Sequence, residues 1–391
     1  MNFIKNNLLV QVVLAILLGI LLGEYLPESI VRIFTTFNTL FSEYLNFAIP
    51  LIILGLIIPA IGSLGSQAGK LVGITALVAY ISTLIAGFSS YGISTAVFPG
   101  LLKNQNLEQM AESAAKLSPY FTISVPPLMD VMTALFLAFI IGVGVAQIKN
   151  STLLNAALDF EIIMSNLIQK TLIPLLPLFI FGIFMNIAYT GEVYTILNVF
   201  IKIIGVIFVM HIAILVFQFV IAGAVSKRNP FTMLKTMLPA YFTALGTQSS
   251  AATIPVTLEQ VRKIGISEDI AKLVVPLCAT IHLSGSTLKI VACCIALMLI
   301  QGMPIEIGAF SGFICMLGIA MVAAPGVPGG AIMAAIGIIG SMLGFNEANQ
   351  ALMISLYIAM DSFGTACNVT GDGAITVLMD HWFGKKKASN T

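Results

Sequence analysis

Long apolar stretches separated by short polar breaks run along almost the whole chain, and eight of them are long enough to predict membrane-spanning helices. They cover residues 8–26, 44–63, 71–98, 130–147, 162–188, 194–225, 270–301 and 348–380. Two further apolar segments, about 231–257 and 305–343, are each interrupted by a turn rich in glycine, serine or proline. Two short arms around such a turn are typical of a re-entrant hairpin, whose tip is tolerated only inside protein or beside a cavity. The pattern predicts an all-α polytopic membrane protein with eight transmembrane helices and two re-entrant helical hairpins.

Basic residues in the short breaks predict the orientation of the chain. With eight spans they fall on one side: Lys5, Lys70, Lys149, Lys227, Arg228, Arg262, Lys263 and Lys385 to Lys387. We therefore expect both termini in the cytoplasm, a location in the cell membrane (the inner or plasma membrane of a prokaryote), and hairpins that enter from opposite sides. Each hairpin is followed by a helix with polar interruptions, so the two units form an inverted repeat. Secondary transporters often place substrate and ions where such repeats meet.

The amino-acid composition is also typical of a protein that lies within a lipid bilayer. Of its 391 residues, 58% are hydrophobic and 9% are charged, against about 25% charged residues in a soluble domain. The formal net charge of +1 shows no basic surface for nucleic acid. The five cysteines all fall in apolar segments and are interpreted as small core residues rather than disulfides or metal ligands.

A polar stripe interrupts the last apolar stretch. Asp361, Thr365, Asn368 and Asp372 are spaced i, i+4, i+7 and i+11, which places them on one face of a helix. Carboxylates at membrane depth are costly, and they usually face the protein interior or a water-filled path. The stripe is therefore the first candidate for a functional site.

Three motifs carry a resemblance to a known family. The first hairpin tip reads Leu-Gly-Thr-Gln-Ser-Ser-Ala-Ala-Thr-Ile-Pro (245–255), the second reads Gly-Val-Pro-Gly-Gly (326–330), and the last helix reads Asn-Val-Thr-Gly-Asp (368–372). In this order they resemble the dicarboxylate/amino acid:cation symporter family, the glutamate transporter homologues, over nearly the whole chain. The resemblance implies an elevator-type homotrimer. The scaffold would comprise residues 1–70 and 99–190, including an external loop, and the moving transport domain would comprise 71–98 and 191–391.

The resemblance also implies the site residues. The substrate-binding residues would be Gln248, Ser249, Ser250, Ser286, Val327, Gly329, Asp361, Gly364, Thr365 and Asn368. Among them, Ser250 and Asn368 would hold the α-carboxylate of the substrate, and Asp361 would pair with its α-ammonium. The cation ligands would be carbonyl groups of Cys278, Thr280, His282 and Asn368, together with the carboxylate of Asp372.

Two departures from the family pattern change the expected chemistry. Members that transport acidic amino acids have an arginine where this chain has Gly364. A second carboxylate on the substrate would therefore lack a guanidinium that binds it in a bidentate way. We therefore predict a neutral amino acid substrate, with room for a larger side chain beside the glycine. The family usually reads Asn-Met-Asp-Gly-Thr where residues 282–286 read His-Leu-Ser-Gly-Ser. Ser284 thus replaces the anionic ligand of a deeper sodium site that would also use Ser82 and Thr83, and we expect fewer sodium sites than is usual in the family.

Lys289 lies at a depth where charged residues are rare and mark functional positions. It follows His282 by seven residues, a spacing that predicts one shared helical face. We hypothesise that its ammonium takes the place of a missing sodium ion and pairs with Asp372 or Asp361, and that protonation replaces part of the sodium coupling. The alternatives are structural roles, in which Lys289 reaches a water-filled edge and His282 is a buried polar residue whose hydrogen bonds are all made. The candidate coupling residues are Lys289, His282 and Ser284.

The sequence therefore predicts a secondary active symporter that takes up a small, neutral amino acid with a cation gradient by an elevator mechanism. One alternative is a proton-coupled or sodium-independent amino acid exchanger that uses Lys289 and His282 in place of a sodium site. A second alternative is a carrier of dicarboxylates or acidic amino acids, or an anion-leaking channel. An enzyme is not expected, because no nucleophile and base occur at a workable spacing.

Overall fold

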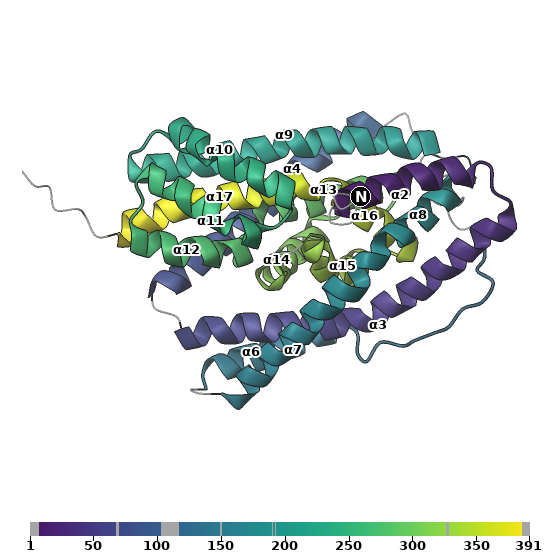
Figure 1. Cartoon of the computed structure of the whole chain (residues 1–391), viewed down its shortest axis with the longest axis horizontal. Coiled ribbons are helices and arrows are strands. Elements are labelled where there is room, and N and C mark those ends of the chain that lie inside the picture. Colours follow the sequence, from purple (N-terminus) through teal and green to yellow (C-terminus); the bar gives the residue numbers. More distant parts are fainter. Residues whose placement is uncertain are drawn as a thin grey trace, which may run out of the picture.

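The computed structural model describes residues 8–67, 70–102, 117–148, 151–189, 191, 193–325 and 328–384, and every element in these ranges is helical (Figure 1). The helices are α2 (Leu8–Gly23), α3 (Glu28–Gln67), α4 (Lys70–Leu102), α6 (Val131–Ala146), α7 (Thr152–Leu167), the π-helix η1 (Ile168–Leu172), α8 (Ile173–Tyr189), α9 (Val193–Ser226), α10 (Pro230–Thr247), α11 (Ser250–Ile264), α12 (Glu268–Ile281), α13 (Ser284–Ile300), α14 (Ile307–Ala323), α15 (Gly330–Leu343), α16 (Glu347–Ala359) and α17 (Asp361–Phe383). Most of the predicted external loop, residues 103–116, lies outside the described residues.

Each predicted span or hairpin coincides with a helix or with consecutive helices. Among the described residues, five helices are long and apolar enough to cross a membrane, and six if the bent pair α16–α17 is one span. These six correspond to six of the eight predicted spans, whereas α2 and α6 coincide with the other two but have only 16 residues each. The pairs α10–α11 and α14–α15 coincide with the predicted hairpins. The chain is thus a helical, multi-pass membrane protein.

The helices pack in two groups. In the first group α3 runs along α6, α7 and α8, and α2 packs on α8. In the second group α17 is surrounded by α9, α10, α11, α12 and α13, while α4 packs along α13. Figure 1 shows α3, α6 and α7 along the lower edge, α9 and α10 along the upper edge, and α14 and α15 between them. Because α14 and α15 contact α3 as well as helices of the second group, the hairpin that they form lies where the two groups meet.

The two hairpin tips are formed by residues with left-handed backbone. Helix α10 ends at Gln248, whose φ is 54°, and Ser249 then caps α11 by accepting a hydrogen bond from the N–H of Ala252 at 3.2 Å. In the second hairpin Gly329, with φ of 74°, directly precedes α15. Glycine adopts this conformation without a steric penalty. The predicted serine-rich and glycine-rich turns therefore lie at the tips as expected.

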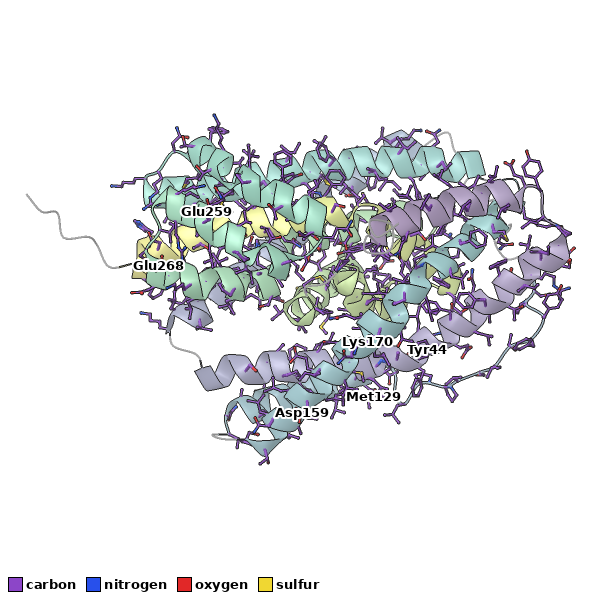
Figure 2. All side chains as sticks on the ribbon, viewed as in Figure 1. Tyr44, Met129, Asp159, Lys170, Glu259 and Glu268 are labelled. Atoms are coloured by element: carbon purple, nitrogen blue, oxygen red, sulfur yellow. The ribbon has the colours of Figure 1, made fainter. Side chains whose placement is uncertain are left out.

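Exposed charges mark one end of the second helix group. Glu259 and Glu268, both labelled in Figure 2, lie there on α11 and at the start of α12. Lys263 pairs with Glu259 at 2.6 Å, and Arg262 pairs with Glu268 at 2.6 Å. Such exposed pairs add little stability, but a belt of charge is expected where helices leave the bilayer.

Gly19 sets the close approach of α2 to α8 and provides a test of this packing. A Cβ atom at Gly19 would lie 2.7 Å from the backbone oxygen of Phe181, which cannot move aside alone. We predict that Gly19→Leu lowers the free energy of unfolding by about 1–3 kcal/mol, the usual cost of overpacking. The measurement is the thermal midpoint of the detergent-purified protein. Gly92→Leu is the matched control, since no atom lies within 4 Å of a Cβ there; an equal fall for both variants would contradict the packing.

Candidate functional site

Two helix breaks bring the polar residues of the chain together. Between α12 and α13, His282 and Leu283 leave the helical conformation, and between α16 and α17 the chain bends by 61°. Helix α17 therefore begins at Asp361 and continues without interruption through Asp372, so the predicted polar stripe is confirmed as one face of one helix. The first residue of a helix is a favourable place for a carboxylate, because the helix dipole and free N–H groups are positive there.

The first carboxylate, Asp361, has two partners from other elements. The Nζ atom of Lys289 lies 3.3 Å from its Oδ1 atom, and the backbone N–H of Gly329 donates to its Oδ2 atom at 2.7 Å. The side chains of Lys289 and Asp361 are only 0% and 5% exposed, so this is a buried ion pair. Lys289 also donates to the backbone oxygen of Tyr357 at 3.3 Å, and its Nζ lies 3.3 Å from the centroid of the Tyr357 ring. Of the two partners that the sequence left open for Lys289, the structure brings Asp361 into contact.

The middle of the stripe is tied to the start of α13. The amide of Asn368 accepts hydrogen bonds from the N–H groups of Gly285 (2.8 Å) and Ser286 (3.3 Å), and it donates to the hydroxyl of Ser286 at 3.0 Å. The hydroxyl of Tyr357 donates to the same oxygen at 3.2 Å. His211 on α9 bonds the backbone oxygen of Gly285 at 3.0 Å. Asn368 thus joins α17 to the start of α13 at the helix break.

The second carboxylate, Asp372, is held by His282. The Nδ1 atom of His282 lies 2.9 Å from Oδ1 of Asp372, and both side chains are at most 1% exposed. The other ring nitrogen lies 3.1 Å from the hydroxyl of Ser82. The amide nitrogen of Gln218 donates to the hydroxyls of Ser82 (3.0 Å) and Ser284 (3.1 Å). These donors assign the imidazole proton to Nδ1, where it faces the carboxylate, and leave Nε2 to accept from Ser82.

Glycines of α17 and α13 make the room that these contacts need. A Cβ at Gly364 would lie 3.0 Å from Nζ of Lys289, and a Cβ at Gly371 would lie 2.8 Å from Cε1 of His282. A Cβ at Gly285 would lie 2.8 Å from the backbone oxygen of Gly364, which keeps α13 and α17 close together. The sequence predicted room for a larger substrate side chain beside Gly364. That prediction is wrong for this structure, because the Lys289 side chain fills the space.

The tip of the first hairpin lies beside the start of α17. The amide of Gln248 donates to the hydroxyl of Ser362 at 3.1 Å, which joins the tip to α17. Ser249 acts as the helix cap described above, whereas Ser250 is the first residue of α11 and is buried. Thr365 is buried on α17. Backbone N–H groups at the start of α11, together with the hydroxyl of Ser250, are suited to an anionic group.

The predicted cation ligands are only partly gathered. The carbonyl oxygen of Cys278 accepts the N–H of His282 at 2.8 Å as the helical cap, and Thr280 is exposed beside a cavity. Val327, which was predicted to bind substrate, lies outside the described residues. In the part of the chain that the structure describes, no three His, Cys, Asp or Glu side chains form a group able to hold a metal ion. Asp372, the carboxylate of the predicted cation ligands, is bonded to His282 instead.

Two features of the site were missed or misjudged from the sequence. The shared helical face of His282 and Lys289 is wrong, because His282 lies in the break before α13 and the two residues contact different carboxylates. Gln218 and Tyr357 were not singled out. Gln218 is a buried amide within an apolar helix, a signal that could have been found, but Tyr357 in an apolar stretch gives no such signal.

A double-mutant cycle tests the buried pair of Lys289 and Asp361. Lys289→Met or Asp361→Asn alone leaves one buried charge unpaired, which is expected to cost about 3–5 kcal/mol. The double variant removes both charges and should lose less stability than the two single losses combined. The thermal midpoint in detergent is the measurement, with Lys272→Met in the exposed pair with Glu268 as control. Additive losses would show that the two side chains do not interact.

Comparison with known proteins confirms the resemblance seen in the motifs. The profile of the sodium:dicarboxylate symporter family matches residues 8–382. The chain is 26% identical over 396 residues to the serine/threonine transporter SstT of Acinetobacter baumannii, covering 97% of each protein. It is 27% identical over 244 residues to excitatory amino acid transporter 2 of Homo sapiens, covering 60% of this chain and 42% of that protein. Because the family match includes both hairpins and both broken helices, the chain belongs to the sodium:dicarboxylate symporter family.

Proposed function

We propose that the chain takes up a small neutral amino acid of the size of serine or threonine in symport with a cation. The observation that carries this proposal is the environment of Gly364, where the ammonium of Lys289 fills the space and is itself paired with Asp361. Among the described residues around Gly364, no guanidinium is present for a second substrate carboxylate. The similarity to a serine/threonine transporter over 97% of the chain supports a small substrate with a hydroxyl group.

The groups proposed to bind the substrate lie along the polar stripe of α17 and at the tip of the first hairpin. The α-carboxylate would lie between Ser250 at the start of α11 and the amide of Asn368, and the α-ammonium would pair with Asp361. A cavity of about 570 Å³ between the first helix group and the hairpins supports an access path. Its lining includes Pro59, Gln169, Ala251, Thr280, Ala324 and Pro325, which come from α3, η1, both hairpins and α12.

The two helix groups support a division into a scaffold and a transport domain. We propose that α4 and α9 to α17 move together against α2, α3 and α6 to α8, in a homotrimer with both termini in the cytoplasm. The close packing of α17 with five helices of its own group supports their movement as one body.

A ligand panel tests the proposed substrate. Serine, threonine and alanine are expected to raise the thermal midpoint in sodium chloride, and labelled serine should accumulate in proteoliposomes with an inward sodium gradient. Aspartate and succinate should do neither, because no guanidinium lies among the described residues around Gly364 to bind a second carboxylate in a bidentate way. Tight aspartate binding without an effect of serine would instead favour the dicarboxylate alternative. Uptake that never saturates would favour a channel.

Cation coupling is proposed to use one sodium ion, because two of the sites implied by the resemblance are altered. His282 is bonded to the Asp372 carboxylate, and Ser284 offers a hydroxyl where the family has a carboxylate. A site formed by backbone carbonyls, including that of Thr280, does not depend on these side chains. A proton-coupled or sodium-independent exchanger is the second candidate, and the contact between His282 and Asp372 is the observation that favours it.

Removing the imidazole distinguishes these two candidates. His282→Asn frees the Asp372 carboxylate while keeping an amide in the break, so sodium should stabilise the variant more than it stabilises the wild type. The measurement is the shift in thermal midpoint between sodium chloride and choline chloride, and His211→Asn is the control at another buried histidine. A smaller or equal sodium shift in His282→Asn, with uptake that follows pH alone, would support the exchanger.

A further inference from the structure

The carboxylate of Asp361 joins three parts of the molecule. One oxygen contacts Lys289 of α13 at 3.3 Å, and the other accepts the N–H of Gly329 at 2.7 Å. Gly329 is the last residue of the second hairpin tip before α15. Both oxygens of the carboxylate are thus satisfied by donors of the protein itself while the hairpin tip rests on it.

The charge at this point limits which forms of the carrier can close. In the proposed function the ammonium of the substrate pairs with Asp361 in the loaded carrier. Once the substrate has left, a tip that closed over an unpaired buried carboxylate would bury an uncompensated charge, which is strongly unfavourable. Lys289 removes this obstacle, because its ammonium supplies the same charge and the same hydrogen-bond donors as the substrate ammonium.

We propose that Lys289 is a tethered counter-cation, which takes the place of the substrate ammonium at Asp361 and lets the second hairpin close over the unloaded site. This inference rests on the proposed function and adds a step to its cycle. A carrier that closes when unloaded can return across the membrane without cargo. Lys289 therefore allows net uptake, whereas a carrier without it would mainly exchange one substrate molecule for another.

Tyr357 offers the ammonium of Lys289 a second set of contacts for the state in which the substrate pairs with Asp361. In the structure the ammonium of Lys289 lies 3.3 Å from Asp361 and also 3.3 Å from the backbone oxygen and from the ring centroid of Tyr357, so the contacts with Tyr357 do not depend on Asp361. Cation–π contacts of this kind are strongest where water is excluded, and Tyr357 is 1% exposed. The lysine stem is flexible, so a small shift of Nζ gives up the contact with Asp361 and keeps those with Tyr357.

The experiment compares net uptake with exchange in proteoliposomes. Labelled serine is supplied to liposomes that are either empty or preloaded with unlabelled serine, and initial rates are normalised to folded, reconstituted protein. The wild type is expected to show net uptake into empty liposomes. In Lys289→Met the ratio of net uptake to exchange should fall about tenfold or more, because the closed unloaded form becomes rare. Lys289→Arg keeps the charge and should restore part of the ratio, and the exposed Lys272→Met is the control that leaves it unchanged.

The outcomes separate this inference from the proposed function. A proportional loss of net uptake and exchange in Lys289→Met would assign Lys289 to substrate binding or stability and overturn the inference. Wild-type exchange without net uptake would overturn it as well, whatever the variants do. If Lys289→Met does not fold, Lys289→Gln, which keeps a hydrogen bond to Asp361 but no charge, is expected to show the same fall. A wild type that neither takes up nor exchanges any neutral amino acid would overturn the proposed function, and this inference with it.

Discussion

A carboxylate buried within a membrane protein needs a positive partner, and this requirement shapes the interior of the molecule. Asp361 and Asp372 lie eleven residues apart on one helix face, both nearly inaccessible to solvent. In a symporter, such carboxylates can be neutralised by transported ions and substrate. Here each is also contacted by a side chain of the protein, Lys289 for the first and His282 for the second. Lys289 therefore balances the charge of Asp361 from within the chain, whereas His282 gives Asp372 a hydrogen bond.

The backbone around the two pairs is arranged so that these partners reach the carboxylates. Breaks in two helices place His282 and Asp361 at helix ends in the centre of the protein. Gly364 and Gly371 of α17 leave room for Lys289 and for His282. A larger residue at Gly364 or Gly371 would push Lys289 or His282 away from its carboxylate. Gly364 and Lys289 thus fit one another, and so do Gly371 and His282.

Much of this arrangement could be predicted from the sequence, since apolar length and turn residues located the spans and both hairpins, although α3 begins at Glu28, well before the predicted residue 44. The polar stripe was also predictable, because α17 is regular and its spacing translates directly into one face. The partners of the stripe were harder. Periodicity placed His282 and Lys289 on one face, but the helix break rotates them toward different carboxylates. Contacts such as that between His282 and Asp372 join residues 90 positions apart, so only the tertiary packing decides them.

The number of sodium ions that accompany each amino acid tests the central claim most directly, namely that side chains of the protein take the place of bound ions. The reversal potential of transport in proteoliposomes gives this number without mutating any residue, since it depends on the sodium and substrate gradients and the coupling ratio alone. The account predicts a ratio of one sodium ion per amino acid. A ratio of two or more would contradict it, because sodium would then have to occupy the sites that are altered by His282 and Ser284.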